Sequence, residues 1–207
     1  MKNRKDFDPI SFDFPEGLED ISEKLLDDHK VLYEGYVNKT NEIQSKVDAT
    51  DLDKAEPNQS YSEFGELKRQ ETFSVNGMKL HEVYFNHLKK GGSPLEGPLK
   101  EMIGKDFGSV DAWKKEMIAT GIASRGWAIL AYDFKDDRLH IYGQDAHNVG
   151  AVWSAAPIIA LDVYEHAYFT DYGKDRKQYI DAFFKNLDFA AANKIVAEWK
   201  LDQMHKG

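Results

Sequence analysis

The sequence of 207 residues contains no cysteine, which removes several kinds of chemistry at once. Disulfides, zinc–thiolate sites and thiol catalysis all need that side chain and are excluded. Basic residues are also scarce: the 27 lysines and arginines are outnumbered by 36 aspartates and glutamates, and the formal net charge is -9. A nucleic-acid-binding protein needs a basic surface that this composition does not supply, so we expect no nucleic acid as a partner.

Long apolar runs are absent as well. No stretch approaches the ~20 consecutive apolar residues of a transmembrane helix, and residues 1–14 lack the apolar core of a signal peptide. We therefore expect no membrane partner and a cytoplasmic location. A hydrophobic content of 42% and a charged content of 30% are typical of a globular chain that buries a full core.

The first part of the chain has the pattern of two long helices. Apolar residues recur at three- and four-residue intervals over residues 18–47 and again over residues 62–87, which predicts two amphipathic helices. The tract between them is rich in Asp, Pro, Asn and Ser and would form the turn of a helical hairpin. We place this hairpin and an irregular N-terminal arm in a first domain of residues 1–92.

The second part of the chain mixes helices and strands. After Gly126 the apolar period changes to two, which predicts an antiparallel pair of strands over residues 127–134 and 138–142. A short apolar run, residues 157–162, would complete a small sheet. The sequence thus predicts an α+β fold, in which the N-terminal helical hairpin is followed by a mixed domain of residues 93–207 with a small three-stranded antiparallel sheet flanked by helices.

Three histidines and one aspartate lie where these elements could bring them together. His29 and His81 are on the apolar faces of the two long helices, and Asp162 and His166 are four residues apart where the third strand ends. Each alone is more typical of a hydrogen-bonded core residue, but the set of four has no obvious structural purpose. Imidazole and carboxylate ligands suit Fe and Mn. The residues alone therefore predict a mononuclear Fe or Mn oxidoreductase and leave its substrate open.

The other four histidines are assigned to ordinary roles. We interpret His87 as a solvated helix end, His140 as a surface residue of a strand, and His205 as part of a frayed C-terminal tail. For His147 a hydrogen bond within a loop is favoured over a place in the lining of the site.

Seven short segments resemble the iron/manganese superoxide dismutases, in the order of that family and near its spacing. They are Ile21-Ser22-x-Lys24 with His29, Tyr36-Val37-x3-Asn41, His81-x2-Tyr84-Phe85, Gly126-Trp127, Gln144-Asp145, Asp162-Val163-Tyr164-Glu165-His166-Ala167-Tyr168 and Asp171-Tyr172-x3-Arg176-x2-Tyr179. The resemblance implies that one Mn or Fe ion per subunit is held by the three histidines and the aspartate, and that the protein converts superoxide, its substrate, to oxygen and hydrogen peroxide.

The resemblance also implies four catalytic side chains around the metal. Gln144 would hydrogen-bond the metal-bound solvent and Tyr36 would join the same network. Trp127 would form part of an aromatic wall, and Arg176 would supply positive charge near the substrate funnel. Manganese is favoured over iron, because Gln144 together with Gly77 is the manganese-type pattern.

A homodimer is the partner state that the resemblance implies, with a tetramer as the alternative. Glu165 would reach across a two-fold axis to His166 of a second chain. Tyr33 would meet Phe169 of that chain in an apolar contact, because phenylalanine replaces a tyrosine that commonly stands there in the family.

Two alternatives to a dismutase stay open. One is a mononuclear iron oxidoreductase of another kind, and the other is a metal-binding relative of the fold with impaired catalysis. The step from His29 to Tyr36 is seven residues, one fewer than the family's usual eight. Seven residues return to nearly the same face of a regular α-helix, so we expect a first helix without a bulge.

Overall fold

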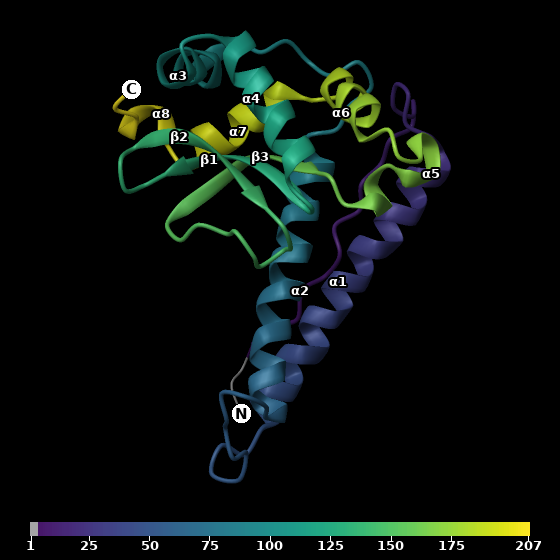
Figure 1. Ribbon diagram of the computed structural model, residues 1–207, viewed down its shortest axis with the longest axis vertical. Coiled ribbons are helices and arrows are strands. Elements are labelled where there is room, and N and C mark those ends of the chain that lie inside the picture. Colours follow the sequence, from purple (N-terminus) through teal and green to yellow (C-terminus); the bar gives the residue numbers. More distant parts are fainter. Residues whose placement is uncertain (1–3) are drawn as a thin grey trace.

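Two long helices, joined as a hairpin, extend away from a smaller sheet and its surrounding helices in the computed structural model, which describes residues 4–207 (Figure 1). The hairpin consists of α1 (Glu23–Ala49) and α2 (Glu63–Asn86). The later elements are α3 (Gly97–Phe107), α4 (Val110–Ala123), β1 (Trp127–Asp133), β2 (Arg138–Gln144), β3 (Ala155–Asp162), a 3-10 turn (Glu165–Ala167), α5 (Phe169–Tyr172), α6 (Arg176–Lys185), α7 (Phe189–Glu198) and α8 (Leu201–Met204). This arrangement confirms the predicted α+β fold class.

Both hairpin helices begin at a serine. The hydroxyls of Ser22 and Ser62 each accept a backbone N–H of the first helical turn, at 3.1 and 3.0 Å, which satisfies a donor that has no partner within the helix. The first helix is α-helical over its whole length, so the prediction of a bulge-free helix between His29 and Tyr36 is confirmed. No helix within residues 4–207 is long and apolar enough to cross a membrane.

The sheet has the strand order β2-β1-β3, and both strand pairs are antiparallel. Trp127, the first residue of β1, lies opposite Gln144 on one side and Asp162 on the other. Directly opposed residues of antiparallel strands project from the same face of a sheet. Because the Trp127 ring lies 5.2 Å from the ring of His81 on α2, this row of three side chains stands at the end of the sheet beside α2.

Side chains near the base of the hairpin join it to the second part of the chain. The Asp171 carboxylate accepts hydrogen bonds from the backbone N–H and the hydroxyl of Ser22, at 2.7 and 2.6 Å. The Tyr179 hydroxyl donates to that of Tyr84 at 3.2 Å, and both residues are buried. The domain boundary between residues 92 and 93 stays a prediction.

The C-terminal end of the chain is docked, so the prediction of a frayed tail is wrong. His205 Nε2 lies 2.6 Å from a carboxylate oxygen of Asp106, and the two side chains are 1% and 3% exposed. The same carboxylate accepts the backbone N–H of Leu139 at 2.7 Å. A partner 99 positions away along the chain, at the end of α3, therefore holds this histidine.

His87 is buried at the end of α2, so the prediction of a solvated helix end is also wrong. Both ring nitrogens lack a hydrogen-bond partner among residues 4–207. The segment after α6 covers this point: Asp188 donates its N–H to the His87 carbonyl at 2.7 Å, and Leu187 pairs with Leu88. Burial lowers the pKa of His87 to about 4, because the charged imidazole would lose its water, and the nearby Val83 carbonyl and the charge of Asp188 offset this only in part.

Replacing His87 by leucine is expected to stabilise the protein in acid. The imidazole titrates near 6.5 when unfolded and near 4 when folded, so the unfolded state takes up the proton first and wild-type stability falls as the pH drops between these values. At about pH 5 the titration of His87 lowers the free energy of unfolding by about 2 kcal/mol relative to neutral pH. The gain in unfolding free energy of His87→Leu over wild type should grow by that amount when urea unfolding is repeated at the lower pH. His140→Leu, at a partly exposed histidine, is the control; a gain independent of pH would contradict the buried neutral imidazole.

Candidate metal centre

Histidines from three segments meet at one carboxylate oxygen of a fourth, Oδ2 of Asp162 at the end of β3. His29 Nε2 on α1 lies 3.2 Å from this oxygen, and His81 Nε2 on α2 lies 3.4 Å from it. His166 Nε2, from the turn after β3, lies 3.1 Å away. One ligand atom from each of the four residues lies within 4.8 Å of the other three. The structure thus brings together the set that the sequence singled out.

His81 is fixed with one ring nitrogen turned towards this point. Its Nδ1 lies 2.6 Å from the Gly77 carbonyl oxygen and donates to it, since a carbonyl can only accept. The neutral ring then has a lone pair on Nε2, which is buried and without a hydrogen-bond partner among residues 4–207. An acceptor on one ring nitrogen is how proteins orient a histidine for ligation through the other.

Burial favours the neutral form of His29 and His81, while Asp162 stays ionised. Burial lowers the pKa of His29, and burial together with the charge of His29 lowers that of His81 to about 3. For Asp162 burial acts upward, but the charge and hydrogen bond of His166 and the contact with His29 outweigh it and lower the pKa of the carboxyl. Three imidazoles and one carboxylate, with the unpaired Nε2 of His81 aimed inward, fit a Mn or Fe ion.

Tyr36, His147 and Trp127 form a hydrogen-bonded chain beside His81. The indole N–H of Trp127 donates to His147 Nδ1 at 3.0 Å. Because an indole nitrogen can only donate, the neutral imidazole carries its proton on Nε2, which lies 2.8 Å from the Tyr36 hydroxyl and donates to it. The Tyr36 ring stacks on His81 with centroids 5.3 Å apart. The structure therefore places Tyr36 and Trp127 beside the four converging side chains, and their catalytic roles stay a prediction.

Gln144 makes no hydrogen bond to this chain of side chains within residues 4–207, and its predicted hydrogen bond to the metal-bound solvent stays a prediction. It is the last residue of β2, and its side chain lines a cavity of about 180 Å³ with Asn76 and Leu80. Its Oε1 is buried and has no hydrogen-bond partner among residues 4–207. The loop after β2 turns back and carries His147 over Trp127 instead. The histidine is visible in the sequence, three residues beyond Gln144. The strand register and the loop that follows decide which of the two residues reaches Tyr36.

Gly77 is explained by the close approach of the Tyr36 ring. A Cβ added to Gly77 would lie 2.8 Å from Cδ1 of Tyr36, closer than carbon atoms can pack. A larger residue at this position would push Tyr36 away from His81. The glycine therefore follows from the packing of Tyr36, whichever metal is bound.

Tyr33 is enclosed by its own chain, which does not fit the predicted contact with Phe169 of a second chain. It is 1% exposed. Its hydroxyl donates to the Glu82 carboxylate at 3.0 Å and accepts the backbone N–H of Ile10 at 2.9 Å. The N-terminal arm thus covers the face that the prediction left open to a partner. Phe169 itself is 55% exposed.

The remaining predicted residues lie at the surface near His166. Glu165 is exposed, and the side chain of His166 is 28% exposed. Arg176 donates to the Ser124 carbonyl at 2.6 Å and to the Tyr168 hydroxyl at 3.3 Å. This guanidinium is therefore tied to the end of α4, and its predicted role near a substrate funnel stays a prediction.

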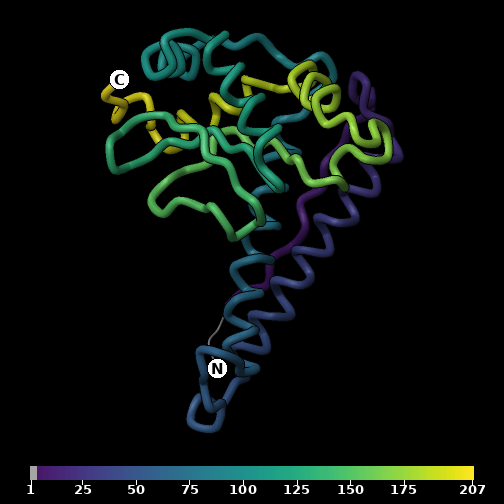
Figure 2. The backbone as a smooth tube through the Cα atoms, viewed as in Figure 1, coloured from purple at the N-terminus to yellow at the C-terminus, as the bar shows by residue number. Residues whose placement is uncertain are grey.

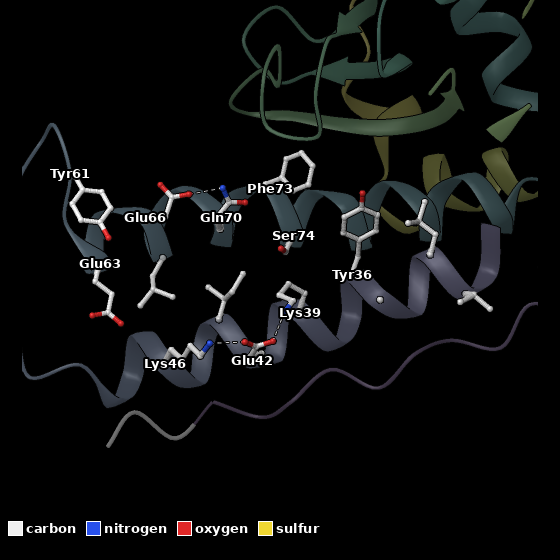
Figure 3. A pocket seen from close by; sticks show the side chains of 15 residues that line it. Tyr36, Lys39, Glu42, Lys46, Tyr61, Glu63, Glu66, Gln70, Phe73 and Ser74 are labelled. Atoms are coloured by element: carbon white, nitrogen blue, oxygen red, sulfur yellow. Dashed lines mark hydrogen bonds and ion pairs between the residues drawn. The ribbon is translucent and has the colours of Figure 1, made fainter. Parts of the chain in front are cut away.

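A groove of about 800 Å³ runs along the hairpin between α1 and α2 (Figure 3). Tyr36 and Phe73 line it near the sheet, and Lys39, Glu42 and Lys46 line it further towards the tip. Since the Tyr36 ring stacks on His81, this ring separates the four converging side chains from the groove.

Comparison with known proteins gives a consistent result. The family model described as iron/manganese superoxide dismutases, C-terminal domain, matches residues 95–195. A protein from Aquifex aeolicus named as an iron superoxide dismutase is 47% identical over 183 residues, which cover 86% of this chain and 85% of the relative. One of the same name from Aquifex pyrophilus is 46% identical with the same coverage. A protein from Haloferax volcanii named as a manganese superoxide dismutase is 37% identical over 186 residues, 89% of this chain and 91% of the relative.

Proposed function

Because the chain belongs to the iron/manganese superoxide dismutase family, we propose that its metal ion is bound by the four converging side chains, which are His29, His81, Asp162 and His166. The protein is a superoxide dismutase that converts superoxide to oxygen and hydrogen peroxide. The ligand proposal is supported by the convergence of three imidazole nitrogens on Asp162 Oδ2. When bound, Fe or Mn supplies one-electron chemistry by alternating between the +3 and +2 states.

Tyr36 and His147 are proposed to handle the protons that hydrogen peroxide formation requires. The Tyr36 hydroxyl accepts from His147, so its own proton is available to a group at the metal site. Burial raises the pKa of Tyr36 to about 12, and the charge of Asp162 acts in the same direction. The phenol is therefore a hydrogen-bond donor at neutral pH. Trp127 fixes the His147 tautomer that makes this orientation possible.

We propose iron as the native metal, with one ion per chain. The sequence favoured manganese through Gln144 and Gly77, but His147 takes the place beside Tyr36 and the ring of Tyr36 accounts for the glycine. The two relatives at 46–47% identity are named for iron. Metal analysis of protein from its native host, with superoxide removal measured per bound Fe and per bound Mn, tests this. Activity confined to the manganese-loaded fraction would contradict it.

A homodimer formed around Glu165 and His166 stays our proposal, with a tetramer as the larger alternative. It is supported by the exposure of Glu165, His166 and Phe169 on one surface segment. In the arrangement implied by the family, each Glu165 carboxylate would accept a hydrogen bond from His166 of the other chain. The cytoplasmic location stays a prediction from the sequence.

Replacing Glu165 by alanine is expected to weaken both association and metal retention. The carboxylate would no longer hold the second ring nitrogen of a metal ligand, a kind of change that typically lowers metal affinity about 10–100-fold. Sedimentation velocity and metal content after dialysis against a chelator measure the two effects. Glu101→Ala, at an exposed glutamate of α3, is the control. Wild-type protein that sediments as a monomer at micromolar concentration would contradict the dimer.

A further inference from the structure

The N-terminal arm, residues 4–14, lies along the helical hairpin rather than in solvent (Figure 2). Arg4 pairs with Asp48 on α1 at 3.2 Å and with Glu71 on α2 at 3.1 Å. The side chain of Asn41 accepts the backbone N–H of Phe7 at 2.9 Å and donates to its carbonyl at 2.8 Å. The arm is thus held at two points well away from the metal centre.

Further along, the arm reaches the level of the metal centre. The Ile10 N–H donates to the Tyr33 hydroxyl, one turn of α1 beyond His29. Phe12 then stacks on Phe85, with ring centroids 5.0 Å apart and an interplanar angle of 29°. The rings of Phe12 and Tyr33 also meet edge to face, with centroids 5.4 Å apart. Phe14, at the end of the arm, also lies near Phe85, with ring centroids 6.5 Å apart, but Phe12 makes the closer contact.

Phe85 connects this contact to a proposed metal ligand. Its ring lies 4.9 Å from that of His29 at 62°, an edge-to-face contact, and the side chain is 1% exposed. Phe85 therefore lies between Phe12 on one side and His29 on the other. The rings of Tyr84, His81 and His166 also lie against His29, with centroids 5.0, 5.0 and 4.9 Å from it.

His29 depends on such packing more than His81 does. The Nδ1 of His81 is fixed by the Gly77 carbonyl, whereas His29 has no such backbone acceptor four residues before it, and its Nδ1 is not among the buried unpaired atoms of residues 4–207. A metal-binding histidine is ordinarily oriented by a hydrogen bond at its other nitrogen. Apart from the contact of its Nε2 with Asp162, the orientation of the His29 ring depends on the rings that enclose it.

We propose that the N-terminal arm is a positioning element of the metal centre, in which Phe12 holds Phe85 against His29. This proposal rests on ligation of the metal by His29. Without Phe12, Phe85 would have room to turn away, and the His29 ring would gain rotational freedom at the metal. Loss of Phe12 should therefore speed up release of the metal and change its coordination geometry, even in a protein that remains folded.

The test compares arm variants of the full chain loaded with manganese. Metal release into excess EDTA, the visible absorption band of the Mn(III) form and the thermal midpoint are measured for each. Phe12→Ala is expected to release manganese about 10-fold faster, because loss of a contact that supports a ligand typically lowers metal affinity by about 10-fold or more. Its absorption band should also shift. Phe12→Tyr, which keeps the ring, should behave as wild type. Phe7→Ala removes a ring of the same arm that is 40% exposed and should change neither release nor spectrum.

The outcomes separate this proposal from the one on which it rests. Wild-type release and spectrum in Phe12→Ala, with only a lower thermal midpoint, would overturn the positioning role and leave the arm as a structural brace. If Phe12→Ala does not fold, Phe12→Leu decides by the same two readouts: intermediate release supports the proposal and wild-type release overturns it. A His29→Ala variant that keeps its manganese would instead overturn the ligand assignment.

Discussion

Replacing His81 by alanine is expected to remove the metal and the activity together. The imidazole is held by the Gly77 carbonyl at one nitrogen and turns the other, buried and unpaired, towards Asp162. Alanine offers no ligand atom, and no neighbouring side chain of residues 4–207 completes the set. Activity should fall by more than the ~10–100-fold that loss of a hydrogen bond to a ligand costs, because the bond to the metal itself is lost.

Metal content per chain and superoxide removal are measured on the same preparation. His140→Ala, at a histidine that pairs with Asp136 on the surface, controls for the loss of any imidazole and should keep both. Circular dichroism shows whether His81→Ala is folded. A fully loaded and fully active His81→Ala protein would mean that the metal is bound elsewhere.

The four converging residues could be predicted because their signals are local. The apolar periodicity places His29 and His81 on the inner faces of two helices, and the end of an apolar strand places Asp162 four residues before His166. The small sheet follows from its period of two in the same way. Where apolar residues recur periodically, the buried face of a helix or strand can be predicted without knowing which segment packs against it.

What the sequence did not predict depends on contacts between distant segments. Tyr33 was predicted to contact a partner chain, but its hydroxyl accepts a hydrogen bond from the N-terminal arm, 23 positions upstream. His87 was predicted to be solvated, but residues 187 and 188 cover it. His205 was predicted to lie in a frayed tail, but its ring contacts the Asp106 carboxylate. For the two histidines a local polar context predicted exposure, for Tyr33 the family resemblance predicted a partner, and in all three cases the contacts come from distant parts of the chain.

Gln144 and His147 show a subtler limit. Both are polar, both lie near the end of β2, and a shift of three residues decides which one contacts Tyr36. The register of β2 against β1 sets Gln144 opposite Trp127, and the turn that follows, in which Asp145 donates to the Val149 carbonyl at 3.1 Å, brings His147 back over the indole. Periodicity predicts the strand but not the path of the loop.

Replacing His147 by leucine is expected to slow turnover about 10–100-fold while leaving the metal bound, the range typical of residues that support a metal centre through hydrogen bonds. Leucine would leave the buried Trp127 N–H without its acceptor and the Tyr36 hydroxyl without its donor, at about 1–3 kcal/mol for each unsatisfied group. The Tyr36 phenol would then lose the contact that orients its proton.

His147→Gln is the informative companion, because an amide can do both jobs of this imidazole. Its carbonyl can accept from Trp127 while its NH2 donates to Tyr36, so it should recover most of the activity that His147→Leu loses. Turnover at high superoxide and its pH profile, compared at equal metal content, separate this role from simple packing. Gln144→Leu is the matched control: its side chain faces the cavity beside Asn76, and we expect less than about a 2-fold change, because no hydrogen bond to the Tyr36 chain is lost. If Gln144→Leu proved the damaging substitution and His147→Leu the silent one, the glutamine would be the residue that supports Tyr36 and the loop would have to follow another path.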